Sequence, residues 1–279
     1  MAGGTIAAAG AGRRFGSIRP RLSLGVRRIL LVAAIFAVWE AATGGFGGQW
    51  QVWDPILLAR PSAAFAELID YSRSGLFLKD LTLTLQAAFA GLLLGMAGGI
   101  ALGLALGYAR PVAETVEPVL VALNSLPRIA LAPILLLWFG IGITSKIFLS
   151  LFTVFFIIFF NTYLGLRSVD PDLIRAVRVM GGGRLHLARF VVLPSVFSWI
   201  FAALRTSVSF ALTGAIVGEF VGSSGGLGYR MVIAAGLLDT NRVYAILLLL
   251  MVIAVVLIEI AKRVEAYLLR WRPSSALLT

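Results

Sequence analysis

The chain has 279 residues, no cysteine, a single histidine and a formal net charge of +11. Hydrophobic residues make up 59% of it and charged residues 13%, whereas soluble domains have roughly 45–50% and 25%. This composition indicates an integral membrane protein, and the absence of cysteine excludes disulfides, thiolate metal sites and thiol catalysis. The arginines gather at the ends of apolar segments rather than on a polar domain, which argues against nucleic-acid binding. We expect His186 on the surface and predict no metal site.

The N-terminal segment, residues 1–28, is basic and has no carboxylate, which predicts a disordered cytoplasmic extension. The apolar run 29–42 is predicted to be the first transmembrane helix, although it is short and contains Glu40. A signal peptide is the alternative, but no convincing small-residue cleavage site follows the run. Residues 44–80 are predicted to form an external connection, in which Pro61-Ser62 precedes AAFAELIDY, a pattern suited to a short interfacial amphipathic helix.

The second predicted span, residues 81–108, carries glycines at intervals of four residues. This spacing places them along one side of a helix and favours close packing against another helix. These glycines are Gly91, Gly95, Gly99, Gly103 and Gly107. Arg110 and Pro111 are expected to end the span, and a turn follows.

The third predicted span, residues 118–140, is expected to be interrupted by Pro127 and Pro133. Prolines free backbone carbonyls, which are tolerated at membrane depth only where protein or a water-filled cavity receives them. Arg128 is costly at this depth and should face a partner or a transport pathway. Contact with an anion is one interpretation, and a side chain that reaches the cytoplasmic surface is another. A further alternative is an ion pair with Glu40, Glu219 or Glu259.

Three more spans are predicted, at 147–166 after an outer turn at Lys146, at 195–218 and at 242–261, with a re-entrant loop over 219–241. One side of the fifth span is polar, which suits a pathway or a dimer contact unless its hydroxyls bond to their own helix. Six spans put both termini in the cytoplasm. Most of the 24 lysines and arginines then lie inside, as the positive-inside rule requires.

The loop at 167–194 is long, polar and rich in arginine. Asp170, followed by a proline, predicts the start of a short helix over 173–180. Three glycines at 181–183 should end that helix, and a second helix should run over 184–194. Such a helix-turn-helix can dock in a groove of another protein. A charged loop that merely obeys the positive-inside rule is the alternative.

Within this loop, Arg175-Ala176-Val177, three residues, Gly181, nine residues, Val191, one residue and Leu193-Pro194 follow a recognisable spacing. It resembles the cytoplasmic EAA loop of ABC importer permeases, whose pattern is Glu-Ala-Ala, three residues, Gly, nine residues, Ile, one residue, Leu-Pro. Arg175 stands in place of the glutamate and Val177 in place of the second alanine. Two other stretches, NSLPRIALAPILLLWFGIG and GEFVGSSGGLGY, resemble permeases grouped with sulfonate, taurine and nitrate importers.

The resemblance implies an all-α polytopic membrane protein with about six transmembrane helices and the type I ABC importer permease fold. The permease domain would cover 29–272 and a short tail 273–279. It implies a subunit of the bacterial cytoplasmic membrane that imports small anions such as sulfonates, taurine or nitrate. The implied partners are a second permease copy, two cytoplasmic ATP-binding subunits that hold ATP and Mg, an external solute-binding protein and the lipid bilayer. This chain has no Walker A sequence and needs no cofactor of its own.

Two groups of site residues follow from the resemblance and from the polar positions. Expected contacts with the ATP-binding subunit are Leu173, Ile174, Arg175, Ala176, Val177, Met180, Gly181, Leu193 and Pro194. Pathway candidates are Asn124, Pro127, Arg128, Arg205, Ser209, Thr213 and Glu219. An ATPase-independent secondary transporter or channel is the alternative, but we detect no inverted repeat and no acidic array for ion coupling. An intramembrane enzyme lacks a catalytic constellation.

Overall fold

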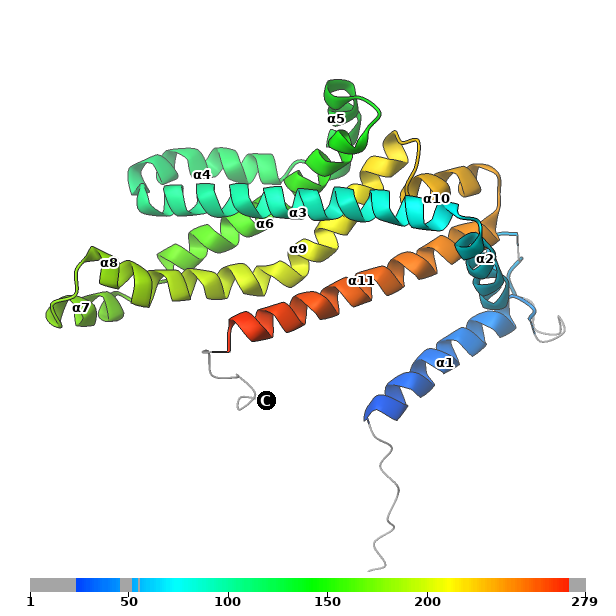
Figure 1. Ribbon diagram of the computed structural model, residues 1–279, viewed down its shortest axis with the longest axis horizontal. Coiled ribbons are helices and arrows are strands. Elements are labelled where there is room, and N and C mark those ends of the chain that lie inside the picture. Colours follow the sequence, from blue (N-terminus) through cyan, green and yellow to red (C-terminus); the bar gives the residue numbers. More distant parts are fainter. Residues whose placement is uncertain (1–23, 46–51, 55, 271–279) are drawn as a thin grey trace, which may run out of the picture.

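The computed structural model describes residues 24–45, 52–54 and 56–270, and every regular element in this part of the chain is helical (Figure 1). Of the segment 1–28, which is predicted to be disordered, residues 1–23 lie outside the described residues and residues 24–28 are helical. The predicted tail 273–279 also lies outside them.

The elements in chain order begin with two short helices near the N-terminus and continue with the long helices of the core. They are α1 (Leu24–Ala42), α2 (Pro61–Arg73), α3 (Leu76–Tyr108), α4 (Arg110–Asn124), the 3-10 helix η1 (Arg128–Leu131), α5 (Ala132–Phe139), α6 (Ile143–Arg167), α7 (Pro171–Val179), α8 (Arg184–Leu187), the π-helix η2 (Ala188–Val192), α9 (Leu193–Val221), α10 (Leu227–Gly236) and α11 (Thr240–Leu268).

The glycine side of α3 lies directly against α6. A Cβ added at Gly95 would lie 2.9 Å from the carbonyl oxygen of Leu151, and one added at Gly99 would lie 2.8 Å from that of Phe155. Contacts this short mean that the two backbones approach more closely than any side chain would permit. The interval of four residues therefore corresponds to a groove that α6 fills along its length.

On its other side α6 meets α9, and Ser150 marks the crossing point. A Cβ added at Gly214 of α9 would lie 2.7 Å from the Cα of Ser150. The Ser150 hydroxyl donates to the carbonyl oxygen of Ala211 at 3.0 Å, so the buried polar group has a partner in the neighbouring helix. Apolar side chains of all three helices, among them Leu92 and Val208, form the core around this point. The α3, α6 and α9 helices thus make one close-packed unit.

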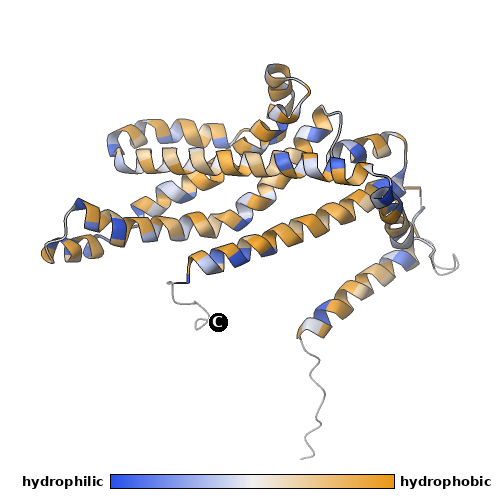
Figure 2. Ribbon diagram, viewed as in Figure 1, coloured by the Kyte–Doolittle hydropathy of each residue, from blue (hydrophilic) through white to orange (hydrophobic). Residues whose placement is uncertain are grey.

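The long helices are apolar along most of their length (Figure 2). Within the described residues four helices are long and apolar enough to cross a membrane: α3, α6, the continuous helix from Arg184 to Val221, and α11. The bent pair of α4 with η1 and α5 makes a fifth if it counts as one span. The remaining helix of the expected six, α1, has three charged side chains among its 19 residues.

The single third span predicted over 118–140 is wrong in its boundaries. The turn expected before it is helical, because α4 already begins at Arg110 with Pro111 in its first turn, where no N–H is needed. Pro127 keeps the residue before it out of the α region, so α4 ends at Asn124. The chain then turns by 87° before α5. The predicted interruption is thus a right-angled break that opens one side of the protein.

Three other boundaries also differ from the prediction. The α3 helix begins at Leu76, so the end of the expected external connection is helical. Lys146, predicted in an outer turn, is buried in the first turn of α6. The loop's second helix does not stop at Pro194 but continues into α9 through the π-helix η2. A π turn accommodates Pro194, which lacks an N–H and would clash with the carbonyl four residues earlier in an α-helix.

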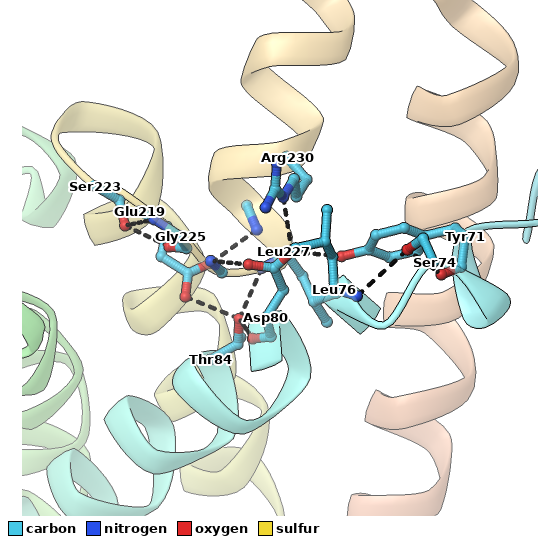
Figure 3. A network of polar contacts seen from close by, with 12 residues as sticks. Tyr71, Ser74, Leu76, Asp80, Thr84, Glu219, Ser223, Gly225, Leu227 and Arg230 are labelled. Atoms are coloured by element: carbon cyan, nitrogen blue, oxygen red, sulfur yellow. Dashed lines mark hydrogen bonds and ion pairs between the residues drawn. The ribbon is translucent and has the colours of Figure 1, made fainter. Parts of the chain in front are cut away.

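A buried polar network anchors the N-terminus of α10 to α3, and its centre is Asp80 (Figure 3). The Asp80 carboxylate accepts hydrogen bonds from the Gly226 N–H at 2.9 Å and from Arg230 Nε at 2.7 Å. It also accepts one from the Tyr71 hydroxyl at 2.8 Å. Burial and the bond to Asp80 raise the pKa of Tyr71 above its ordinary value, so the hydroxyl keeps its proton even more firmly than an exposed tyrosine does.

Glu219, at the end of α9, completes the network. Its two carboxylate oxygens accept hydrogen bonds from the Thr84 hydroxyl at 2.8 Å and from the Gly228 N–H at 2.7 Å. Gly226 has a φ of +108°, and a Cβ there would overlap the Glu219 carboxylate. Two carboxylates therefore stabilise the first N–H groups of α10 and fix this helix to α3 and α9.

We expect Asp80→Asn to destabilise the protein, because it leaves the Arg230 guanidinium beside a neutral group. The Asp80 side chain is 1% exposed and that of Arg230 28%, so the loss should be about 3 kcal/mol, at the lower end of the range for a broken buried pair. Thermal unfolding in detergent measures this loss of stability as a lower unfolding temperature. Arg242→Gln, which removes the more exposed pair with Glu67, is the matched control and should shift that temperature little. Equal shifts would contradict a structural role for Asp80.

The glycine groove predicts a difference between neighbouring positions of α3. Gly99→Ala places a methyl group 2.8 Å from a backbone oxygen of α6 and should cost about 1–3 kcal/mol by overpacking. Gly98→Ala meets only the Phe155 ring, at 3.4 Å, and should be neutral or stabilising through its helix propensity. Thermal unfolding of the two purified variants measures the difference, and equal stability would contradict the packing.

Candidate functional site

The α7 helix begins at a well-defined cap. The Asp170 carboxylate accepts the backbone N–H of Asp172 at 2.8 Å, and Pro171 occupies the first turn. The carboxylate gives a partner to one N–H group at the helix start, and the proline has no N–H that would need a partner. The helix runs over Pro171–Val179, and the sequence predicts it over 173–180.

The α7 helix ends at the glycine turn in a Schellman motif. Gly181 has a φ of +79°, and its N–H donates to the carbonyl oxygen of Arg178 at 3.0 Å. The N–H of Gly182 donates to the carbonyl oxygen of Val177 at 2.8 Å. These two bonds close the helix and turn the chain back into α8. Gly181 is therefore needed for its backbone conformation, since its surroundings are open.

The surface of α7 has a half-buried side and an exposed side. Ile174 and Val177 are half-buried, whereas Arg175 and Ala176 are exposed. Leu173 is 51% exposed, and Met180, at the C-cap of the helix, is 85% exposed.

The last two predicted contact residues lie apart from α7. Leu193 and Pro194 belong to the first turn of α9, where they line a shallow pocket with Arg189 and Phe197. The structure thus presents residues 173–181 as one surface and the Leu-Pro pair as a second one.

A cavity of about 410 Å³ lies where α4 breaks, between that break and the middle of α9. Its lining combines polar and apolar side chains from α4, η1, α6 and α9. Four of the predicted pathway residues are among them: Asn124, Pro127, Arg128 and Thr213. The proline break creates this cavity, because the chain leaves the bundle there and exposes the side of α9.

Arg128 extends over this cavity and is held by two contacts. Its Nη2 donates to the Asn124 Oδ1 at 2.8 Å, and its guanidinium carbon lies 5.6 Å from the centroid of the Phe210 ring. Its Nε is buried and has no hydrogen-bond partner in the described part of the chain. The cation is therefore positioned by a neutral amide and an aromatic face, and no described carboxylate neutralises it.

The ion pair suggested as an alternative for Arg128 is absent among the described residues. Glu40 accepts from Ser62, Glu259 pairs with Lys262 and Arg263, and Glu219 belongs to the α10 network. All three carboxylates are engaged elsewhere.

The other pathway candidates lie outside the cavity lining. Arg205 pairs with Glu265 of α11 at 2.9 Å. Ser209 is also absent from the lining, and its carbonyl oxygen accepts a hydrogen bond from the Thr213 hydroxyl, so the self-bonding of hydroxyls weighed as an alternative occurs in this helix. Glu219 is 1% exposed and anchors α10. Its position is therefore structural.

Sequence reasoning overlooked Asp80, Thr84 and Arg230. Asp80 and Arg230 are separated by 150 positions, and a single sequence contains no signal that pairs them. The only indication was a carboxylate close to the start of a long apolar run, which the expected boundary at Leu81 left in a loop.

Comparison with known proteins agrees with this architecture. Residues 95–270 match the family described as binding-protein-dependent transport system inner membrane component. The riboflavin transport system permease protein RibX of Chloroflexus aurantiacus is 34% identical over 252 residues, which cover 90% of this chain and 91% of that relative. The SsuC protein of Bacillus subtilis, named for aliphatic sulfonate transport, is 30% identical over 249 residues, 89% of this chain and 88% of its own.

Solved structures show the same fold. The MetNI methionine ABC transporter in an inward-facing conformation aligns with a TM-score of 0.61 and 21% identity, over 69% of this chain and 95% of that chain. Relatives of this kind are transport subunits, and in ABC importers a separate subunit hydrolyses ATP. The chain therefore belongs to the family of binding-protein-dependent transport system inner membrane components, the permease subunits of ABC importers.

Proposed function

We propose that two copies of this permease form the pathway of an importer for a small anion, with both termini in the cytoplasm. In this proposal α7 docks in a cleft of each cytoplasmic ATP-binding subunit, which carries ATP and Mg. An external solute-binding protein delivers the cargo. Closure of the ATP-binding subunits then rocks the two permeases between inward-open and outward-open states.

The position and rigidity of α7 support its proposed role. It connects α6 and α9, the two helices that cross at Ser150, through short segments at either end. Its N-terminal cap and its Schellman motif hold it as one rigid piece. A force applied to α7 therefore reaches both helices directly.

The glycine turn provides a test of this coupling. Gly181→Val puts a β-branched residue at a φ of +79°, which costs about 1–2 kcal/mol and should displace α7. We expect the variant to insert in the membrane but to lose most uptake relative to ATP hydrolysis. Gly181→Asn is the matched control, because Asn tolerates left-handed angles, and it should retain coupling. Reconstituted complexes report both rates, and full coupling in the valine variant would contradict the role of the turn.

Arg128 is the observation that favours an anion as cargo. Its charge has no described carboxylate partner, and it lies half-buried beside Phe210 at the cavity, with its Nε lacking a hydrogen-bond partner among the described residues. A cation held in this way binds an anionic group that replaces water. The relative SsuC is named for the transport of sulfonates, which are anions and fit this chemistry. The relative RibX is named for the transport of riboflavin, whose aromatic ring system would contact Phe210 instead.

We expect Arg128→Gln to lower uptake of the delivered anion roughly tenfold or more at saturating binding protein, as the loss of a charged hydrogen bond implies. Arg205→Gln removes an arginine that pairs with Glu265 outside the cavity and serves as the control with near-normal uptake. Uptake of radiolabelled alkanesulfonate and riboflavin by reconstituted complexes measures the effect. Equal uptake by the two variants would remove Arg128 from the pathway, and riboflavin uptake unaffected by Arg128→Gln would point to the flavin as cargo.

A further inference from the structure

The carboxylates at the loop end of the molecule are all engaged within the chain. Glu114 pairs with Arg110 and Glu117 with Arg167. Asp170 caps α7, as described above. Asp172 pairs with Arg175 at 2.7 Å, within the same helix.

The arginines at this end exceed these carboxylates. Arg178 and Arg184 are exposed and have no carboxylate partner in the described part of the chain. They lie at either side of the glycine turn, one near the end of α7 and the other at the start of α8. The turn thus carries two unpaired positive charges.

Large apolar side chains lie next to these arginines in the chain. Val179 is 88% exposed, Met180 85% and Leu185 79%. Exposed apolar side chains flanked by charged ones are typical of a protein-binding surface with an apolar centre and a polar rim. We call the set Arg178, Val179, Met180, Arg184 and Leu185 the turn surface.

We propose that the cleft of the ATP-binding subunit that receives the turn surface has an apolar floor and an acidic rim facing Arg178 and Arg184. This inference rests on the proposed docking of α7 and specifies the partner's charge. A neutral or basic rim would leave two arginines desolvated without partners, which opposes binding, whereas carboxylates on the rim complement them. Because the family's usual glutamate is replaced by Arg175 and the nearby aspartates are engaged internally, this chain presents no free carboxylate on the described part of the loop.

An anionic lipid headgroup would also attract arginines, but the geometry favours a protein. Figure 1 shows α7 and α8 at one extreme of the long axis, beyond the end of α3. If the long helices cross the membrane, the turn surface projects out of the bilayer plane rather than along it. Lipid headgroups are polar and also provide no apolar complement for Val179 and Met180.

The experiment measures binding of the ATP-binding subunit that copurifies with this chain to the permease in nanodiscs, at low and high KCl. We expect the double variant Arg178→Gln, Arg184→Gln to raise the Kd roughly tenfold at low salt and to make the Kd depend less on salt. Arg178→Lys with Arg184→Lys should restore most of the binding. Arg263→Gln on α11, whose arginine pairs with Glu259 and is 80% exposed, is the matched control and should leave the Kd unchanged.

The Met180→Ser variant tests the docking of α7 separately from the proposed charge of the cleft's rim. If Met180→Ser weakens binding while the arginine double variant keeps both the wild-type Kd and its salt slope, α7 docks but the rim is not acidic. If neither variant affects binding, the docking of α7 is wrong as well. Repeating the titration in nanodiscs of neutral phosphatidylcholine tests for lipid: loss of the arginine effect there would assign these arginines to anionic headgroups and overturn the proposal.

Discussion

Close contact between the backbones of α6 and its two neighbours is the constraint on which the rest of this structure depends. Lipid does not favour the association of apolar helices through the hydrophobic effect, so van der Waals contact and hydrogen bonds between helices have to hold them together. Glycines of α3 on one side and Gly214 of α9 on the other permit that contact, and the Ser150 hydroxyl bonds across it. The unit of α3, α6 and α9 is consequently stiff, and other elements are positioned relative to it.

Both candidate sites derive their position from this unit. The α7 helix lies in the segment that connects the end of α6 to the start of α9. The cavity at Arg128 uses the side of α9 that the departure of α5 leaves uncovered. At the far end, Asp80 and Glu219 attach α10 to the same helices. A movement of α6 and α9 would therefore displace α7, the cavity and α10 together.

Local chemistry made part of this architecture predictable. The four-residue glycine interval indicates a packing groove, and Asp170 and Gly181 indicate where α7 begins and ends, because each acts within a few residues of its own position. Pro127 indicates a break, but the size of the bend is set by how α5 packs against α6. The bonds of Asp80 to Gly226 and Arg230 depend on the folded arrangement of segments far apart in the chain. The same holds for Arg128, whose neighbour Phe210 comes from a different helix.

The π-helix before Pro194 has a consequence for the direction in which the loop faces. A π turn holds one residue more than an α turn, so α8 is rotated by about 100° from the phase that an uninterrupted α-helix would give it. That rotation determines on which flank of the molecule Arg184 and Leu185 emerge. The phase is set within the π turn, where Val191 and Val192 are buried. The direction of this exposed surface is thereby determined by buried residues that a binding partner need not contact.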